Sequence, residues 1–539
     1  MAKHCSLASS DCFNVVNVSG APFERALQAV VAQGLANRAG GAVYIVGIDR
    51  FAGAHGIEWF PGSGCAGCEG LRTRWLRTVI EAIPKRAPTF ISLDALLKLV
   101  RPLLLGVAFY DAAAPHSLGP VITACGLQSL LPATSATGLP FALPMLFDGR
   151  GRWADATAAT WYVAKELLPR ANRSTLAIQA PTNLPFLADV IVMWRLPTFW
   201  MADMCRDVTQ RAALRYLVEG SGHFDAAPVV QYFGWFNHTG LPNTELLCQC
   251  TARKRLVTIA SDWSENLSFL SSIAPDRTLA FRQPDDAVVV SGYSRDRTYV
   301  AIVVSDGDNL AQDWSNLRPM LERRIALQSR VPLSWTVSNR WLTLGWPILK
   351  WVYDVLSLPG RRGHDSVLMG PSGYGYIFPG AVVDEGARRE LGRRTVAAAT
   401  ALDMQAYVHW DVDQALEPAS RARTTRAVAM YNGTAIRGAF MLGSDPIADT
   451  VGDVVVINRP ALPWGFADNL TTAAAKLNGL PRGTITYAYM NMKTDPARVD
   501  ALATMLSPHV QLLGHRELMR VARMAHASHV AARATAVRT

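Results

Sequence analysis

Residues 299–309 read YVAIVVSDGDN, an apolar run of strand character that ends in polar side chains. Short runs of this kind recur at intervals of roughly 30–40 residues and are separated by segments of helical period such as 386–402 and 469–478. The other runs are 228–236, 256–260, 331–337, 366–369, 405–410, 437–442, 454–458, 484–490 and 509–513. Repeated strand–helix units predict a (β/α)₈ barrel of the TIM type. The candidate strands outnumber the eight places of such a barrel, so we expect at least two of them to lie outside it.

The first part of the chain has a different pattern of apolar runs and helical segments. Residues 42–47, 104–110 and 175–179 form short apolar runs typical of buried strands, and 24–37 and 155–168 have helical periodicity. This alternation predicts an α/β layered domain with a parallel sheet. We therefore expect an N-terminal α/β domain over 1–225, a barrel-like domain over 226–520, and a basic, Ala-rich tail over 521–539.

Composition narrows the class of protein. The chain has 539 residues, of which 50% are hydrophobic and 18% are charged, and this mixture argues against disorder. The net charge of +10 comes from scattered Arg clusters without a nucleic-acid-binding motif, so we expect no nucleic-acid partner. No apolar run is long enough for a membrane span, and the N-terminus lacks the apolar stretch of a signal peptide. The sequence gives no indication of the oligomeric state.

Cysteines and glycosylation sequons suggest a secreted or lumenal protein. Eight cysteines all lie before residue 251, and Cys65 and Cys68 form a lone CxxC for which a local disulfide or ordinary thiols are expected. N-x-Ser/Thr sequons occur at Asn17, Asn172, Asn237, Asn266, Asn432 and Asn469.

Polar clusters directly follow several of the predicted strands. Active sites of barrels form at the carboxyl ends of the strands, where the βα-loops converge. The clusters contain Asp306, Asp308 and Asn309 after strand 299–304, Asn339 after 331–337, Tyr374 and Tyr376 after 366–369, Trp410, Asp411 and Asp413 at the end of 405–410, and Glu245 beyond 228–236.

The run from Gly373 to Pro379 resembles the signature of the GxGYxYP family of putative glycoside hydrolases. The 305–309 cluster resembles the acidic motif of that family, and 33–38, 110–111 and 124–127 resemble its N-terminal domain, so the likeness covers about 14–515. Phe378 departs from the signature, which has a second Tyr there. The resemblance implies an N-terminal α/β domain, a barrel-like catalytic domain and action on carbohydrate, without an established catalytic assignment.

Glycoside hydrolysis commonly uses two carboxyl groups that flank the scissile bond. In extended backbone, Asp306 and Asp308 point the same way and could both face the barrel mouth. We expect Asp306 to be nucleophile or base, with its neighbour raising its pKa by like charge. The partner acid would come from Asp411, Asp413 or Glu245. We further expect substrate contacts from two tyrosines, two asparagines and a tryptophan, namely Tyr374, Tyr376, Asn309, Asn339 and Trp410.

Other interpretations of these residues stay open. Asp-Gly-Asp-Asn also suits a helix N-cap or a turn. It could hold Mg²⁺ or Ca²⁺, although the calcium-loop pattern fails because its twelfth position, counted from Asp306, is Leu317. We expect no cofactor and no metal, and a carbohydrate substrate. The rival hypotheses are a non-catalytic carbohydrate-binding protein of the same fold and a metal-dependent deacetylase or transferase.

Overall fold

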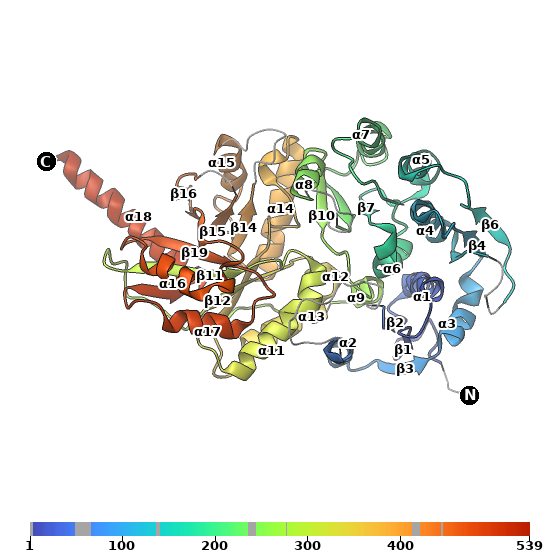
Figure 1. The fold of residues 1–539 in the computed structure, drawn as a ribbon, viewed down its shortest axis with the longest axis horizontal. Helices are drawn as coiled ribbons and strands as arrows, with labels where there is room; N and C mark the ends of the chain where they lie inside the picture. Colours follow the sequence, from blue (N-terminus) through green and yellow to red (C-terminus); the bar gives the residue numbers. More distant parts are fainter. Residues whose placement is uncertain are drawn as a thin grey trace. The chain divides into compact units, whose positions relative to one another are not determined.

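The computed structural model describes residues 4–48, 66–135, 139, 141–235, 244–275, 278–411, 421–443 and 446–538. By its internal contacts the chain divides into unit 1, residues 1–277 and 340–349, and unit 2, residues 278–339 and 350–539. Unit 1 is coloured blue to green in Figure 1, and unit 2 is largely yellow to red. The domain boundary at residue 225 stays a prediction beside this division.

Three parallel sheets organise unit 1. Their strand orders are β2-β1-β3, β5-β4-β6 and β10-β9-β7-β8, so the earliest strand of each sheet has neighbours on both sides. The strands are β1 (Cys12–Asn17), β2 (Val43–Val46), β3 (Ala87–Ile91), β4 (Gly106–Phe109), β5 (Leu130–Ala133), β6 (Met145–Asp148), β7 (Thr175–Ile178), β8 (Thr198–Phe199), β9 (Val230–Phe233) and β10 (Leu256–Ile259). All their pairings are parallel, which confirms the α/β class with parallel sheets.

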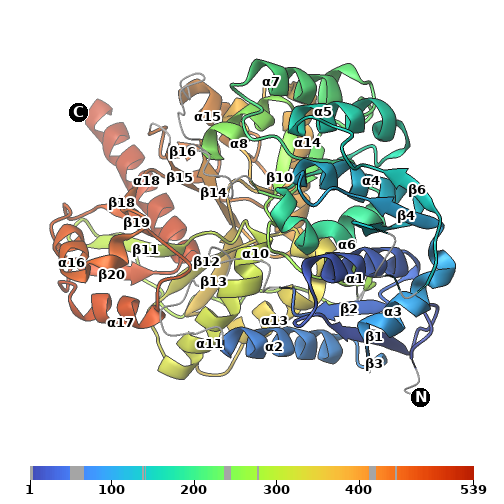
Figure 2. The same ribbon diagram turned by 45° about the vertical axis from the view of Figure 1, so that its right-hand side comes forward.

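The earliest strands of the three sheets, β1, β4 and β7, each lead into a helix, and these helices pack together. They are α1 (Phe23–Ala36), α4 (Leu118–Gln128) and α6 (Leu184–Trp194), and Figures 1 and 2 show them side by side. The contact between α1 and α6 is close, because a Cβ at position 34 would lie 2.4 Å from the carbonyl oxygen of Asp189. The remaining helices of unit 1 are α2 (Ala66–Ala82), α3 (Leu93–Val100), α5 (Ala156–Tyr162), α7 (Val208–Arg215), α8 (Thr244–Arg253), α9 (Leu267–Ser272) and α12 (Trp341–Leu344). Unit 1 thus repeats one strand–helix arrangement three times.

Buried polar side chains join α1 to α9. Gln33 Nε2 donates to Asn266 Oδ1 at 2.7 Å, and Asn37 Nδ2 donates to Ser268 Oγ at 2.9 Å. The Asn266 side-chain amide also donates to the carbonyl oxygen of Ile45 at 2.8 Å, and Asn266 is only 4% exposed. The sequon at Asn266 is therefore a structural motif of the unit 1 core, and it contributes nothing to the argument for glycosylation.

Unit 2 contains a ten-stranded sheet. Its strand order is β16-β17-β15-β14-β13-β12-β11-β19-β18, with β20 also paired to β11, and only the β16–β17 pair is antiparallel. The strands are β11 (Thr298–Val304), β12 (Leu333–Val337), β13 (Asp365–Met369), β14 (Ala406–Trp410), β15 (Gly438–Leu442), β16 (Thr450–Val451), β17 (Val454–Ile457), β18 (Pro460–Leu462), β19 (Ile485–Met490) and β20 (Val510–Leu513). The helices are α10 (Leu310–Gln312), α11 (Arg318–Leu327), α14 (Glu385–Ala401), α15 (Arg421–Ala429), α16 (Leu470–Asn478), α17 (Pro496–Thr504) and α18 (His515–Arg538), while α13 (Trp346–Leu356) spans the division between the units.

The predicted barrel is not confirmed, although most of its predicted strands are present. Eight of the ten predicted strands are β11–β15, β17, β19 and β20 of unit 2, but 228–236 and 256–260 contain β9 and β10, which pair with β7 in unit 1. Within the described residues, the strand pairing of the unit 2 sheet does not close on itself. Periodicity identified the strands but carries no information on which sheet each of them joins, so it could not establish a closed barrel.

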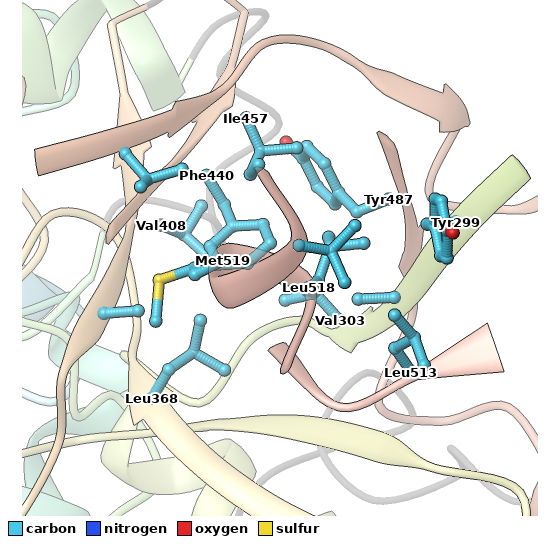
Figure 3. Packing of buried hydrophobic residues seen from close by; sticks show 14 of the residues in the cluster. Tyr299, Val303, Leu368, Val408, Phe440, Ile457, Tyr487, Leu513, Leu518 and Met519 are labelled. Atoms are coloured by element: carbon cyan, nitrogen blue, oxygen red, sulfur yellow. The ribbon is translucent and has the colours of Figure 1, made fainter. Parts of the chain in front are cut away.

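One face of the unit 2 sheet surrounds the first turns of α18. Leu518, Met519 and Val521 pack among buried side chains from β11, β13–β15, β17, β19 and β20, such as Tyr299 and Phe440 (Figure 3). Val521, the first residue of the basic, Ala-rich tail expected over 521–539, therefore belongs to a core helix. At the start of α18, the backbone N–H of His515 donates to Ser334 Oγ at 3.0 Å, near the amino end of β12. The carboxyl ends of the strands thus lie at the opposite edge of the sheet.

Two disulfides join cysteines of unit 1, Cys5 to Cys12 and Cys205 to Cys250. Cys125 and Cys248 are buried and take part in neither disulfide, and the side chains of Cys65 and Cys68 lie outside the described residues. Replacing both Cys205 and Cys250 by Ser is expected to lower the free energy of unfolding of unit 1 by about 4 kcal/mol, because the unfolded chain regains the freedom of a long loop. In the matched variant, Ser replaces both Cys5 and Cys12. This variant loses a disulfide that closes only a short loop, so its free energy of unfolding should fall by only about 2 kcal/mol. Urea denaturation of both variants without reductant measures the difference, and equal costs would contradict the loop argument.

Candidate functional site

The carboxyl end of β11 carries two aspartates in one tight loop. Gly307 lets this loop pass close to β12, because a Cβ there would lie 1.7 Å from the carbonyl oxygen of Thr336. The loop is fixed by hydrogen bonds, since the Gly307 N–H donates to Thr336 Oγ1 at 2.9 Å and Thr336 Oγ1 donates to the Val304 carbonyl at 2.7 Å. Asp306 has a φ of +73°, an uncommon conformation for a residue with a side chain that short polar residues tolerate best. The loop therefore holds Asp306 in one strained and well-defined position.

The Asp306 carboxyl is the most perturbed acid of this loop. Burial raises its pKa from 3.8 to about 6, while the Lys493 ammonium and a hydrogen bond with the Ser305 side chain oppose the rise. The sequence predicted a raised pKa from the like charge of Asp308, but the main physical cause is the partial burial of the Asp306 side chain. Asp306 therefore keeps a proton at mildly acidic pH, where an ordinary Asp is ionised.

Asp308 belongs to the same loop as Asp306. It is 9% exposed, and its backbone packs against Gly370, the residue that follows β13, since a Cβ there would lie 2.6 Å from the Asp308 nitrogen. The pKa of Tyr489 lies well above its usual value, because burial and the charges of both Asp306 and Asp308 disfavour the phenolate. Both carboxyl groups thus lie near the hydroxyl of Tyr489, at the end of β19. The structure brings these two predicted acids together.

Two residues of the site escaped the sequence analysis. Lys493 follows β19 and is close enough to Asp306 to act on its pKa. Trp464 follows β18, is 44% exposed, and donates its indole N–H to Ser305 Oγ at 2.5 Å. The rule that polar clusters follow strands would have found Lys493 after the predicted strand 484–490. Trp464 follows a three-residue strand without a periodic signal, so sequence periodicity could not place it.

Asp411 lies at the carboxyl end of β14 and is 3% exposed. Its carboxylate accepts from the Gly380 N–H at 3.1 Å to each oxygen and from Thr424 Oγ1 at 3.2 Å. His409 Nε2 lies 3.0 Å from Asp411 Oδ2, and the buried His409 ring also bonds the Tyr407 hydroxyl at 2.9 Å. Asp411 therefore fixes the loop that follows Pro379. Its catalytic role stays a prediction.

The two other predicted acids are not placed by the structure. Asp413 lies outside the described residues. Glu245 belongs to α8 of unit 1, and its side chain also lies outside the described part. Both assignments stay predictions.

The tyrosine loop after β13 is largely packed into the protein. Tyr376 is 8% exposed, with ring centroids 5.9 Å from Phe378 and 6.5 Å from Trp410. The Arg394 guanidinium of α14 lies over the Tyr374 ring, 5.6 Å from its centroid. Phe378 is fully buried, so the apolar ring that departs from the family signature serves the core.

The sequence predicted Asn309 and Asn339 as substrate contacts, but in the structure both side chains form hydrogen bonds with backbone groups. Asn309 Oδ1 accepts from the Ala311 N–H at 2.8 Å and caps α10, which is the structural role that the sequence left open for this cluster. Asn339 Nδ2 donates to the Gly373 carbonyl at 2.8 Å, while its buried Oδ1 has no partner within the part of the chain that the structure describes. The buried indole N–H of Trp410 likewise has no partner among the described residues. Substrate binding by these side chains stays a prediction.

A search of the described residues finds no group of three or more His, Cys, Asp or Glu side chains arranged to hold a metal ion. In the same part of the chain, no helix is both long and apolar enough to cross a bilayer.

Comparison with known proteins places this site in a family. Residues 296–523 match the model described as the GxGYxYP putative glycoside hydrolase C-terminal domain. This part of the chain is a GxGYxYP C-terminal domain. The GxGYxYP domain includes the Asp306 loop, the tyrosine loop and Lys493, so the family resemblance seen in the sequence is confirmed. The search of curated proteins yields no match.

Solved structures show how far the fold extends. The crystal structure of a putative hydrolase from Bacteroides thetaiotaomicron VPI-5482 is 18% identical, with a TM-score of 0.74 over 97% of this chain and 96% of that chain. At this identity the likeness shows a shared fold for nearly the whole chain, beyond the GxGYxYP domain. A putative polysaccharide deacetylase from Mycobacterium smegmatis is 13% identical, with a TM-score of 0.31 over 45% of this chain and 95% of that chain.

Proposed function

We propose that the chain is a glycoside hydrolase that cleaves O-glycosidic bonds, with Asp306 as its proton donor. The observation that carries this proposal is a loop-end carboxyl group whose pKa is raised to about 6 by burial. A general acid must hold its proton at working pH and release it to the departing oxygen, and a raised pKa serves that need. A nucleophile, in contrast, must already be ionised. We therefore assign Asp306 the donor role in place of the nucleophile or base expected from the sequence.

Asp308 is our choice for the ionised partner carboxylate. It lies beside Asp306 near Tyr489, and the Lys493 ammonium nearby favours negative charge in this region. The partner either attacks the sugar or activates a water molecule, while Asp306 protonates the leaving oxygen. Asp413 and Glu245 are the alternative partners. Asp411 is less suited, because both of its oxygens already accept hydrogen bonds from the Gly380 N–H.

Trp464 is the residue that we propose as a platform for the sugar ring. Its side chain is 44% exposed, and the bond from its indole N–H to Ser305 fixes the ring next to the residue that precedes Asp306. An aromatic face held in place offers a large contact area to the apolar face of a sugar at little entropic cost. Tyr376 and Trp410 would line the side of the sugar site, whereas Trp464 would offer the exposed ring face.

The test is a hydrolysis screen with aryl glycosides and natural glycans. Wild type is run beside Asp306→Asn, Asp308→Asn and the control Asp296→Asn, whose side chain is exposed. We expect activity in wild type and in the control, and its loss in the other two variants. The rate should fall as the pH rises above about 6, because Asp306 then loses its proton. A rate that instead rises through pH 6 would restore the role of Asp306 as base or nucleophile. Sugar binding without turnover in any variant would favour the non-catalytic binding protein.

Lys493 provides a second test of the same site. Lys493→Met is expected to raise the pKa of Asp306 further above 6, because the variant removes the positive charge that holds this pKa down. The fall in activity at high pH should shift to higher pH in this variant. The control is Lys476→Met, on the exposed face of α16, and its pH profile should match the wild type. Identical profiles for both variants would remove Lys493 from the site.

We also propose that the protein works in an oxidising compartment, outside the cytoplasm. The disulfides Cys5–Cys12 and Cys205–Cys250 support this, because such bonds persist in secreted or lumenal proteins. Mass mapping of the cysteines in protein purified without reductant tests the proposal. Fully reduced cysteines would contradict it.

A further inference from the structure

Unit 1 has a pocket whose lining includes no residue of the Asp306 loop. It has a volume of about 320 Å³, at the lower end of the range for small-molecule sites. Its lining residues are Phe23, Tyr110, Asp111, Ala112, Pro115, Leu118, Pro181 and Thr182. The lining is mostly apolar, with a few polar groups that could orient a ligand.

The topology explains why a pocket forms here. Phe23 begins α1, after β1; Tyr110 and Asp111 directly follow β4; and Pro181 and Thr182 lie between β7 and α6. The pocket is therefore built from the three equivalent strand-to-helix loops of the repeated arrangement, where α1, α4 and α6 begin. In open α/β sheets, ligands bind in crevices outside the carboxyl ends of the strands. Unit 1 brings three such ends to one place.

Two adjacent residues supply the polar chemistry of the pocket. The Tyr110 hydroxyl makes no hydrogen bond within the described chain, and burial, with the nearby charge of Glu24, raises its pKa, so it remains a donor. Asp111 Oδ1 accepts from the Ala113 N–H at 2.9 Å and thereby fixes the loop. No described group donates to Asp111 Oδ2. A bound ligand thus meets one donor and one carboxylate acceptor beside aromatic rings.

Charge selects the class of ligand. Asp111 lines the pocket and Glu24 lies near Tyr110, so an anion would meet two negative charges. The Arg150 guanidinium also acts on Asp111, but it is paired with the Asp148 carboxylate and so offsets these charges only in part. Glu24 is fixed by hydrogen bonds from the Thr134 N–H at 3.0 Å and Thr134 Oγ1 at 2.7 Å, so its charge is part of the framework. A neutral sugar ring has hydroxyl donors for a carboxylate and an apolar face for aromatic rings. An organic cation with an apolar body could neutralise the carboxylate charge, but it would offer no acceptor to the Tyr110 hydroxyl.

We infer that this pocket binds one neutral sugar ring, with the ring packed on Tyr110 and Phe23 and its hydroxyls bonded to Asp111. It would act as an accessory binding site for carbohydrate, separate from the Asp306 loop. The inference shares the substrate class of the proposed function, but it concerns binding alone and stands even if Asp306 is not catalytic.

Ligand-observed NMR titration of the full chain with methyl glycosides of neutral hexoses tests the inference. The variants are Tyr110→Phe, which removes only the hydroxyl, and Asp111→Asn, which keeps the Oδ1 acceptor for Ala113 and so preserves the loop. The control is Asp11→Asn, an exposed residue before the amino end of β1. Methyl glucuronate and benzylammonium serve as the charged comparison ligands.

We expect at least one neutral glycoside to bind, with its Kd raised about tenfold or more in Asp111→Asn, raised in Tyr110→Phe, and unchanged in Asp11→Asn. Any hydrolysis of small aryl glycosides should be unchanged in all three variants, which separates this site from the proposed catalytic one. The inference is overturned if no neutral glycoside binds in a manner that depends on Asp111. It is equally overturned if benzylammonium or glucuronate is the ligand that depends on these side chains.

Discussion

The Asp306→Asn variant is expected to lose hydrolytic activity by at least about 100-fold and, at neutral pH, to become more stable than the wild type. The two effects have one cause. The position that raises the pKa of Asp306 to about 6 suits a proton donor, but it penalises the ionised carboxylate at higher pH. An Asn side chain of nearly the same shape cannot donate that proton and carries no charge, so it removes both the function and the penalty.

The sign of the pH dependence follows from the two states of the chain. The unfolded Asp has a pKa near 3.8 and the folded one about 6, so between these values the folded state binds more protons. Wild-type stability therefore falls as the pH rises through this window, by up to about 3 kcal/mol for a shift of this size. Below pH 4 the advantage of the variant should vanish. Above about pH 6 it should be complete.

Chemical denaturation at pH 4 and pH 7.5 measures this difference. Asp296→Asn is the control, since its exposed side chain should leave the pH dependence unchanged. A purely structural Asp306 would give a less stable variant at pH 7.5. That result, together with retained activity, would remove Asp306 from the mechanism.

Sequence reasoning predicted the strands better than their arrangement. The runs at 299–304 and 405–410 coincide closely with β11 and β14, because a buried strand in a parallel sheet is apolar throughout. The sequence of a strand does not show which neighbouring strand it pairs with. Residues 256–260 read like the barrel strands, yet β10 pairs with β9 in unit 1.

The candidate site shows the same limit. Asp306 and Asp308 could be predicted, because acidic residues directly after a strand are conspicuous in the sequence. Lys493 and Trp464 are brought to them only by the pairing of β19 with β11 and of β18 with β19. The burial that sets the pKa of Asp306 is likewise a property of the packed structure.

Asp365→Asn is expected to lower the free energy of unfolding by about 3–5 kcal/mol, a large loss for a single substitution. Asp365 begins β13, is 2% exposed, and lies between two buried guanidinium groups. Arg324 Nε lies 2.8 Å from Asp365 Oδ1, and Arg361 forms an ion pair with Oδ2. The Trp335 indole N–H also donates to Oδ1, at 2.9 Å. Burial already lowers the pKa of Arg324, and the Asp365 carboxylate opposes that loss of charge. A neutral Asn would leave both guanidinium charges buried without their directly paired anion, while Asp500 acts on Arg324 more weakly than Asp365 does.

Urea denaturation of Asp365→Asn beside Asp354→Asn tests this expectation. Asp354 pairs with Lys350 at 2.6 Å on α13, but both side chains are exposed, so its loss should cost well under about 1 kcal/mol. Equal, small costs for the two variants would show that buried water or a shifted Arg pKa compensates for Asp365. Asp365 lies at the amino end of β13, whereas the tyrosine loop follows the carboxyl end, at Met369. Molecules of Asp365→Asn that remain folded at low temperature should therefore keep the wild-type rate, which separates a structural carboxylate of this domain from the catalytic one.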